Sequence, residues 1–289
     1  MARIAYVNGQ YVNQLEASVH IEDRGYQFSD GIYEYMAFYN RRLLDGDLHL
    51  QRMKRSLAAL NIPQPMSAES MLVVINELIA RNSREHGGLY IQITRGVARR
   101  DHPFPKDTKP SLVMTICAPK FAKPHEFAEG VKVITYPDRR WQRRDIKSVS
   151  LLANVLAKQE AVVNNVREAW LLRDGDTVSE ASVSNAYIVD KDGTLITHPA
   201  DEHILGGVTR DVVLRLARTS GVKVIERPFT MSEVKEAAEA FITSTSINIL
   251  PVVKIDEHRV GAGKPGEVTL KLRQLYEEYI YKQTGFRRA

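Results

Sequence analysis

The chain has 289 residues, of which 44% are hydrophobic and 26% charged, and its formal net charge is +5. This composition is ordinary for a globular protein and excludes disordered and collagen-like classes. At roughly 150 residues per domain, the length predicts about two domains. The single cysteine, Cys117, excludes an intrachain disulfide framework and a cysteine-cluster metal site.

No apolar run approaches the ~18 residues of a membrane helix, and the first residues lack the apolar core of a signal peptide. We therefore expect a cytoplasmic protein with no membrane partner. The mild positive charge suits anionic partners, such as a phosphate cofactor, carboxylate substrates or nucleic acid.

The first part of the chain has the pattern of several strands and two helices. Asn8-Gly9 between two short strand-like runs is typical of a two-residue hairpin turn. Asp47 is suited to cap a helix whose apolar stripe includes Leu48, Met53, Leu57 and Leu60. Further strands are expected at 31–40, 88–96 and 111–119, and a second helix at 68–82.

Residues 118–130 contain two prolines and little periodicity, which is typical of an interdomain connection. We therefore expect an N-terminal α+β domain at 1–118, a linker at 119–124 and a C-terminal α/β domain at 125–289. In the second domain, Thr230 and Glu233 form a predicted capping box. Helices are expected at 148–165, 209–220 and 266–283, and strands at 131–138, 168–173, 184–198, 241–246 and 249–255.

Lys147 ends a short apolar stretch just before a predicted helix. Arg140, Arg143 and Arg144 lie within seven residues of it, and such neighbours disfavour a further positive charge. Lys147 is therefore a candidate for Schiff-base chemistry. The alternative is a solvated lysine at a helix start.

A second candidate site lies at residues 178–185, where Glu180 is a single carboxylate among Ser182, Ser184 and Asn185. This group could bind a protonated ring nitrogen. The alternative is an exposed turn, because serine and asparagine favour turns by themselves.

Gly206 and Gly207 precede a predicted helix, which places free backbone N–H groups where a phosphate could bind. Thr209 adds a hydroxyl, and residues 243–246 add further hydroxyls and amides. The segment matches neither a Walker A loop nor the dinucleotide-binding glycine motif. Ordinary capping needs the same groups and remains the alternative.

His49 and Arg52 share one helix face, and arginine is a strong phosphate ligand. Arg100 and His102 alternate, so in an extended chain they point to the same side and, with a tyrosine, could bind a carboxylate. A polar loop is the alternative. The basic run at 138–147 could contact nucleic acid, although it is short and contains two aspartates.

Taken together, these segments resemble the fold-type IV, pyridoxal-phosphate-dependent aminotransferases, and within that family the D-amino-acid branch. The resembling segments occur in family order and cover nearly the whole chain: 22–34, the helix with His49 and Arg52, 94–105, 140–161, 177–185, 197–213 and 241–246. The resemblance implies a two-domain α/β (α+β) fold with the active site between the domains, pyridoxal 5′-phosphate (PLP) as cofactor, and a homodimer whose loops close the partner's site.

The resemblance also implies roles for individual residues. Lys147 would form the internal aldimine and move the proton, and Glu180 would keep the pyridine nitrogen protonated so that the ring acts as an electron sink. Arg52 and the backbone amides of Val208 and Thr209 would bind the phosphate. Further cofactor contacts would come from Ser184, Ser244 and Thr245, with Arg140 nearby and no metal ion.

On the substrate side, the resemblance implies that Tyr33, Arg100 and His102 hold the α-carboxylate of a D-amino acid such as D-alanine. A ping-pong reaction would then use a 2-oxo acid such as 2-oxoglutarate or pyruvate. Val183 replaces a serine common in relatives, and Ala37 replaces a lysine of a related enzyme on the same strand. These departures bear on which amino acids are accepted.

Three other functions stay open at this stage. A branched-chain L-amino-acid aminotransferase would share Lys147 and Glu180 but generally lacks the Arg-x-His pair. An aminodeoxychorismate-lyase-like enzyme of the family would release pyruvate without an amino acceptor. A nucleic-acid-binding protein would use residues 138–147; the family resemblance instead implies no nucleic-acid partner.

Overall fold

A computed structural model describes residues 3–119 and 121–287 of the protein. The chain forms two compact units. Unit 1 contains the described residues up to 119 together with Ile146–Ser150 and Lys282–Phe286, and unit 2 contains the others. The two added segments lie in the C-terminal domain expected from sequence, but their backbone and side chains bond to unit 1.

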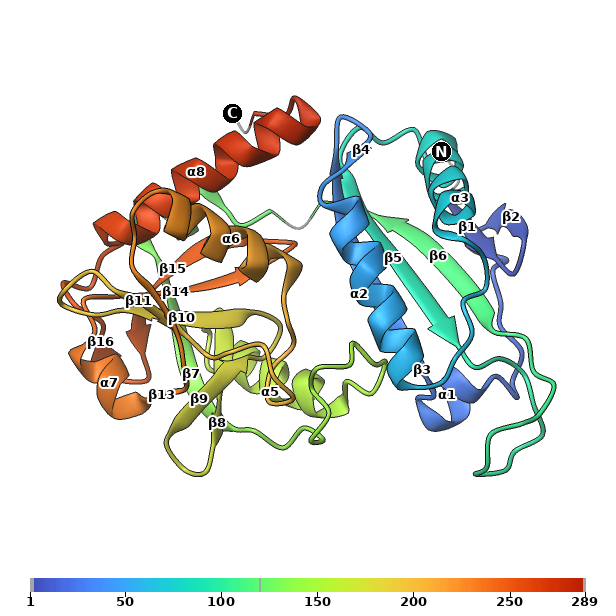
Figure 1. The fold of residues 1–289 in the computed structure, drawn as a ribbon, viewed down its shortest axis with the longest axis horizontal. Helices are drawn as coiled ribbons and strands as arrows, with labels where there is room; N and C mark the ends of the chain where they lie inside the picture. Colours follow the sequence, from blue (N-terminus) through green and yellow to red (C-terminus); the bar gives the residue numbers. More distant parts are fainter. Residues whose placement is uncertain (1–2, 120, 288–289) are drawn as a thin grey trace. The chain divides into compact units, whose positions relative to one another are not determined.

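Unit 1 is built on a six-stranded antiparallel sheet in the order β2-β1-β6-β5-β3-β4 (Figure 1). Its strands are β1 Ile4–Val7, β2 Gln10–Asn13, β3 Gly31–Tyr39, β4 Arg42–Leu43, β5 Gly87–Thr94 and β6 Ser111–Cys117. The predicted hairpin turn is confirmed, because Asn8 and Gly9 both have positive φ between β1 and β2.

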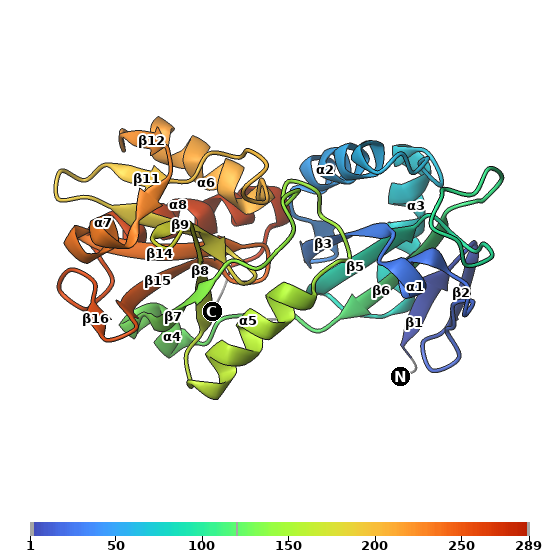
Figure 2. The same ribbon diagram turned by 90° about the horizontal axis from the view of Figure 1, so that it is seen from below.

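Three helices accompany this sheet: α1 Arg24–Phe28, α2 Gly46–Ala59 and α3 Ala68–Arg81. Helices α2 and α3 cover one face, as Figure 2 shows. Because side chains alternate along a strand, Ile32, Met36 and Phe38 of β3 all enter the core beneath these helices. The opposite face of β3 carries tyrosines.

The start of α2 differs from the prediction. Its N-cap is Asp45, which has a left-handed backbone and makes no side-chain capping bond. Asp47 instead lies in the first turn, where its negative charge suits the helix dipole. The short helix α1 was not expected; its N-cap Asp23 accepts a hydrogen bond from Gly25 N at 2.8 Å.

Unit 2 contains a mixed ten-stranded sheet in the order β12-β11-β10-β14-β15-β7-β8-β9-β13, with β16 paired to β15. The strands are β7 Val131–Pro137, β8 Glu168–Arg173, β9 Thr177–Ala181, β10 Asn185–Val189, β11 Leu195–Thr197, β12 Val224–Glu226, β13 Phe229–Thr230, β14 Glu239–Ser244, β15 Asn248–Ile255 and β16 His258–Arg259. Trp170, Phe229 and Ile242 are central to its main core.

The helices of unit 2 are α4 Pro124–Glu129, α5 Leu152–Val163, α6 Val208–Thr219, α7 Met231–Glu236 and α8 Glu267–Thr284. The Thr230–Glu233 capping box is confirmed at α7. Helix α5 is shorter than the expected 148–165 because its leading residues are extended and pair with β3. Part of the expected connection at 118–130 is helical, since Pro124 starts α4. Within the described residues, no helix is both long and apolar enough to cross a membrane.

Candidate active site

Lys147 lies on an extended segment that adds to the free edge of β3. Tyr33 N donates a hydrogen bond to Lys147 O at 2.9 Å, and Val149 N donates to Gly31 O at 3.1 Å. Ser148 forms an antiparallel bridge with Ile32 between them. The lysine expected just before a helix is therefore fixed to a sheet, five residues before α5 begins.

The Lys147 side chain lies over an aromatic ring. Its Nζ is 4.1 Å from the centroid of the Tyr33 ring, which stacks on Tyr90 with centroids 5.6 Å apart. Lys147 N also donates to Ser56 Oγ of α2 at 3.3 Å. The predicted catalytic lysine and one predicted substrate ligand, Tyr33, are thus together in unit 1.

The helix face next to this lysine carries a buried ion pair. Arg52 lies one turn before Ser56 on α2. Its Nε donates a hydrogen bond to Glu34 Oε2 of β3 at 3.0 Å, and its Nη2 donates to Oε1 at 2.5 Å. His49 Nδ1 lies 3.1 Å from the same carboxylate, and all three side chains are buried. The predicted phosphate ligand Arg52 therefore has its direction set by Glu34.

Charge and burial oppose each other in this cluster. Burial raises the pKa of Glu34, but Arg52 and His49 overcome this effect and leave it well below the ordinary value. For His49, burial is the largest influence and lowers the pKa, although Glu34 acts in the other direction. The arrangement therefore favours an ionised Glu34, a charged Arg52 and a neutral His49.

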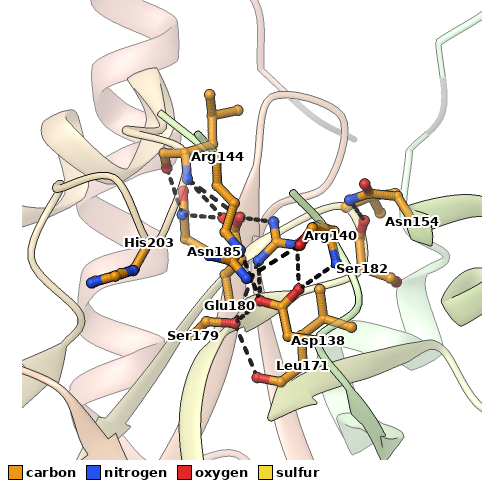
Figure 3. Close-up of polar contacts among 12 residues, drawn as sticks. Asp138, Arg140, Arg144, Asn154, Leu171, Ser179, Glu180, Ser182, Asn185 and His203 are labelled. Atoms are coloured by element: carbon orange, nitrogen blue, oxygen red, sulfur yellow. Dashed lines mark hydrogen bonds and ion pairs between the residues drawn. The ribbon is translucent and has the colours of Figure 1, made fainter. Parts of the chain in front are cut away.

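In unit 2, Glu180 near the end of β9 lies at the centre of a buried polar network (Figure 3). It forms an ion pair with Arg140 Nη1 and accepts hydrogen bonds from Asn185 Nδ2 at 3.0 Å and Leu205 N at 3.3 Å. Burial raises the pKa of Glu180, while Arg140 and Leu205 N oppose that rise.

The arginines near Lys147 in sequence are each paired with a carboxylate. Asp138 accepts from Arg140 Nη2 at 2.8 Å and lies 3.2 Å from Arg144 Nε, and Arg143 pairs with Asp145. Their positive charges are therefore largely balanced. The expectation that they act on Lys147 is not supported by this arrangement.

The start of α6 lies against the Glu180 network. Its N-cap Gly207 makes no side-chain capping bond, and a Cβ on Gly207 would meet Asn185 Oδ1 at 2.1 Å. The predicted phosphate ligands Val208 and Thr209 are the first two residues of this helix and are buried. Backbone N–H groups and helix dipole thus face the surroundings of Asn185, as an anion site requires.

The hydroxyl-rich segment at 243–246 follows β14, against which α6 packs and whose Thr243 is paired with Asn185 of β10. Predicted ligand Ser244 ends this strand, and its Oγ lies 3.2 Å from Ser246 Oγ. Thr245 lies between these two serines. Val208, Thr209, Ser244 and Thr245 therefore belong to neighbouring elements of unit 2.

Ser184 lies beside a buried carboxylate that was not expected from sequence. Its hydroxyl donates to Glu168 Oε1 at 2.7 Å, and the same carboxylate accepts from Ser182 Oγ at 3.3 Å and Val183 N at 3.1 Å. Glu168 thus holds the turn between Glu180 and Asn185. The Val183 side chain is exposed.

The side chains of Arg100 and His102 both contact the Phe28 ring. The Arg100 guanidinium lies 4.7 Å from the Phe28 ring centroid, and the His102 ring lies 5.6 Å from it. Arg24 supports this loop by donating to Asp101 O at 2.6 Å. Among the described residues, none of the ring contacts and hydrogen bonds of Arg100 and His102 involves Tyr33, so the predicted trio is not joined by direct contacts within one chain.

The residue types in each unit suit parts of PLP. In unit 2, the buried carboxylate of Glu180 would suit the ring nitrogen, and the N–H groups at the start of α6 would suit the phosphate. In unit 1, Lys147 is the lysine that the aldehyde would need. In the part of the chain that the structure describes, no three His, Cys, Asp or Glu side chains are placed to hold a metal ion.

Sequence reasoning missed the carboxylates that orient these groups: Glu34, Asp138 and Glu168. The sequence does indicate two of them. Glu34 and Glu168 are each the single carboxylate of a largely apolar strand, and a buried charged side chain needs a partner. The identity of that partner depends on tertiary contacts.

Comparison with known proteins gives a consistent result. The family model "Amino-transferase class IV" matches residues 31–255. The chain is 41% identical over 281 residues to a D-alanine aminotransferase of Staphylococcus haemolyticus, covering 97% of this chain and 99% of that protein. A D-alanine aminotransferase of Listeria monocytogenes serotype 4b is 42% identical over 281 residues, or 96% of each chain.

Solved structures show the same fold. The branched-chain amino acid aminotransferase of Escherichia coli superimposes with a TM-score of 0.90 at 22% identity, covering 100% of this chain and 97% of that one. A T.th. branched-chain amino acid aminotransferase, complexed with N-(5′-phosphopyridoxyl)-L-glutamate, gives a TM-score of 0.87 at 25% identity, covering 98% of this chain and 95% of that one.

Proposed function

Since the chain belongs to the class IV aminotransferases, we propose that it transfers the amino group of D-amino acids, such as D-alanine, to a 2-oxo acid such as 2-oxoglutarate or pyruvate, with PLP as cofactor. The observation that carries the proposal is the buried Glu180 carboxylate, which Asn185 hydrogen-bonds to the loop that leads into α6. When bound, PLP supplies the electron sink for the reaction.

The residues of unit 2 would hold the ring and the phosphate. Glu180 would pair with the pyridine nitrogen, while Arg140 and Asn185 keep the carboxylate in place. The N–H groups at Val208 and Thr209, at the start of α6, would bind the phosphate, with hydroxyls from Ser244 and Thr245. Arg52 is assigned to the phosphate because its guanidinium is a strong phosphate ligand. Ser184 supports this site through Glu168.

Lys147 would be the proton carrier. Its Nζ, once free, accepts the α-proton of the amino acid and returns it during the reverse half-reaction, as a positioned general base. Each half-reaction moves one amino group, so a D-amino acid leaves as a 2-oxo acid and a second 2-oxo acid leaves as a D-amino acid. Tyr33, Arg100 and His102 are assigned to the substrate carboxylate.

The D-amino-acid assignment is supported by the D-alanine aminotransferases that this chain resembles along nearly its whole length and by the Arg100-x-His102 pair. We infer that the enzyme acts as a homodimer in the cytoplasm. Sedimentation of the purified protein tests the dimer, because a stable monomer at micromolar concentration would contradict it.

The first test is the visible spectrum of the purified holoenzyme. A yellow protein whose absorbance moves to shorter wavelength when D-alanine is added supports both the cofactor and the first half-reaction. A response to L-leucine but not to D-alanine favours a branched-chain aminotransferase instead. Pyruvate release without an acceptor would favour lyase activity.

The second test is the Lys147→Ala variant beside Lys54→Ala, whose lysine is exposed on α2. Lys147→Ala should abolish turnover and the yellow absorbance, whereas Lys54→Ala should keep both. Substantial turnover by the first variant would overturn the assignment. Arg100→Leu should mainly raise KM for D-alanine, because it removes a carboxylate contact.

A further inference from the structure

A buried ion-pair cluster in unit 1 bonds to the loop that carries Arg100 and His102. Its centre is Asp30, which accepts hydrogen bonds from Arg24 Nε at 2.8 Å and from Arg95 Nε at 2.7 Å. Arg95 Nη2 adds a bond to the second carboxylate oxygen at 3.0 Å. All three side chains are largely buried, so breaking this Arg–Asp–Arg triad is far more costly than breaking a solvated surface pair.

Arg24 uses the rest of its guanidinium group on the loop. Its Nη1 donates to Asp101 O at 2.6 Å, and its Nη2 donates to His102 O at 3.3 Å. The three nitrogens of one side chain therefore bind a carboxylate and two consecutive loop carbonyls, which requires the rigid fork of arginine. Residues 98–110 lie outside every helix and strand and are mostly exposed, so these bonds supply order that the loop lacks by itself.

The Phe28 ring contacts the same groups. The guanidinium of Arg24 lies 4.8 Å from the ring centroid, and that of Arg100 lies 4.7 Å from it. Both distances are within the range of a cation–π interaction. The His102 ring is 5.6 Å from the same centroid. One aromatic ring, itself in contact with the triad, thus contacts both side chains assigned to the substrate carboxylate.

Arg95 holds the loop at a second point. Its guanidinium lies 3.6 Å from the centroid of the Phe104 ring, two residues beyond His102. The same guanidinium donates to Leu60 O at 2.7 Å and to Asn61 O at 3.0 Å, just after α2. The triad therefore ties both sides of His102 to the folded core of unit 1.

We propose that Arg24 is a positioning residue for substrate binding, which holds the loop so that Arg100 and His102 present their side chains together to one carboxylate. The inference rests on the proposed function, which assigns these two side chains to the substrate carboxylate. Arg24 acts through the loop backbone and the Phe28 ring and does not itself touch the substrate. A loop that is already ordered loses less conformational freedom when substrate binds, which favours binding.

Loss of this order should weaken binding rather than slow the chemistry. The contacts to the carboxylate are present both in the bound substrate and in the transition state. An interaction of this kind contributes to KM and leaves kcat nearly unchanged when it is removed.

The test compares full-length holoenzymes in transamination between D-alanine and 2-oxoglutarate. Arg24→Lys keeps the positive charge but cannot bind Asp30 and both loop carbonyls at once. Arg81→Lys is the matched control, because Arg81 is an exposed arginine of unit 1 that also pairs with a carboxylate, Glu77, and lies over an aromatic ring, Tyr11.

Arg24→Lys should raise KM for D-alanine about 5- to 30-fold, as expected when two side chains must be ordered on binding, and should change kcat less than about twofold. Arg81→Lys should keep both constants. Phe28→Leu, at a half-buried position, should also raise KM, whereas Phe28→Tyr keeps the ring and should behave like the wild type. This second pair decides the outcome if Arg24→Lys does not fold.

Trypsin reports on the loop without substrate, because Arg99 and Arg100 are exposed cleavage sites within it. Mass spectrometry of the digests should show cleavage at these sites about 5-fold or more faster in Arg24→Lys than in the wild type, since local order limits proteolysis. Arg81→Lys should be cleaved there at the wild-type rate.

An unchanged KM in Arg24→Lys overturns the proposal, as does a loss that appears in kcat instead. A higher KM with unchanged cleavage also overturns it, because Arg24 would then act on the substrate without ordering the loop. A wild-type enzyme that does not transaminate D-alanine refutes the proposed function and the link to substrate with it. The cleavage rates still decide, in that case, whether Arg24 holds the loop.

Discussion

Asn185 donates a hydrogen bond from Nδ2 to Glu180 Oε2 at 3.0 Å and another to Leu205 O at 2.9 Å. One amide thus ties the carboxylate on β9 to the loop that leads into α6. The same side chain leaves no room at Gly207, where a Cβ would come within 2.1 Å of its Oδ1. The placement of Glu180 and the start of the helix are therefore coupled.

This coupling predicts different outcomes for two adjacent glycines. Gly207→Ala should displace Asn185 and weaken its bond to Glu180, a loss of about 1.5–3 kcal/mol for a hydrogen bond to a charged group. Converted at 1.4 kcal/mol per factor of ten, PLP affinity should fall roughly 10- to 100-fold. Titration of the cofactor-free protein with PLP measures this.

Gly206→Ala is the matched control, because the nearest atom to its added Cβ is Ala200 Cβ at 3.6 Å, an ordinary contact distance. It should bind PLP with near wild-type affinity. Equal affinities for the two variants would show that Asn185 does not transmit a change at position 207 to the cofactor site.

The buried Glu34–Arg52 pair should matter far more for stability than an exposed pair of the same residue types. Glu34→Ala leaves Arg52 without its carboxylate inside the core and should cost about 3–5 kcal/mol of unfolding free energy. The control is Glu77→Ala, which removes an exposed i,i+4 partner of Arg81 and should cost only about 0.3–0.5 kcal/mol. Urea unfolding followed by circular dichroism compares them, and similar losses would contradict the role given to burial.

The same carboxylate should give unit 1 a defined sensitivity to acid. Burial raises the pKa of Glu34, but Arg52 and His49 hold it well below its ordinary value in the folded protein. Below about pH 4.5 the unfolded chain therefore binds a proton at Glu34 that the folded chain does not. The stability contributed by Glu34 is complete above that pH and is lost as the pH falls toward the folded-state pKa.

Urea unfolding measured between pH 6 and pH 3 tests this sensitivity. Wild-type unfolding free energy should fall more steeply below about pH 4.5 than that of Glu34→Gln, which cannot titrate at this position. Parallel slopes for the two proteins would mean that Glu34 keeps an ordinary pKa when folded.

The local sequence was sufficient for most of the elements, whereas the roles of the site residues came from the family resemblance and stay predictions. The hairpin turn at Asn8-Gly9 and the capping box of Thr230 and Glu233 were predicted correctly, because each depends only on residues that are close in sequence. The pairing of Lys147 with Tyr33 joins segments more than a hundred positions apart in the chain. No local periodicity encodes such a contact, so Lys147 was expected beside a helix.

Charge partners were missed for the same reason. Arg140 in a basic run suggests a free positive surface, yet Asp138 and the distant Glu180 both bind it. The Ser184 hydroxyl donates to Glu168 of β8, a partner that the sequence does not indicate, and its role as a cofactor ligand stays a prediction. For Arg140 and Ser184, the sequence identifies a polar side chain that needs a partner. The strand register of the folded chain determines which carboxylate that partner is.

The last described residues of the chain should stabilise the end of β3. The Phe286 ring stacks on Tyr39 with centroids 4.7 Å apart and lies 4.6 Å from His86. Asn40 Nδ2 donates to Thr284 O at 3.1 Å beside this stack. Aromatic pairs contribute about 0.5–1.5 kcal/mol beyond their buried area, so Phe286→Ala should cost about 2 kcal/mol.

Hydrogen exchange distinguishes a local effect from a global one. In Phe286→Ala, amides at 39–43 should exchange faster, because the stack covers the turn between β3 and β4. Tyr281→Ala is the control, since this more exposed aromatic residue near the same helix end contacts Arg287 instead. If exchange at 39–43 is the same in both variants, the Phe286 stack does not hold this turn.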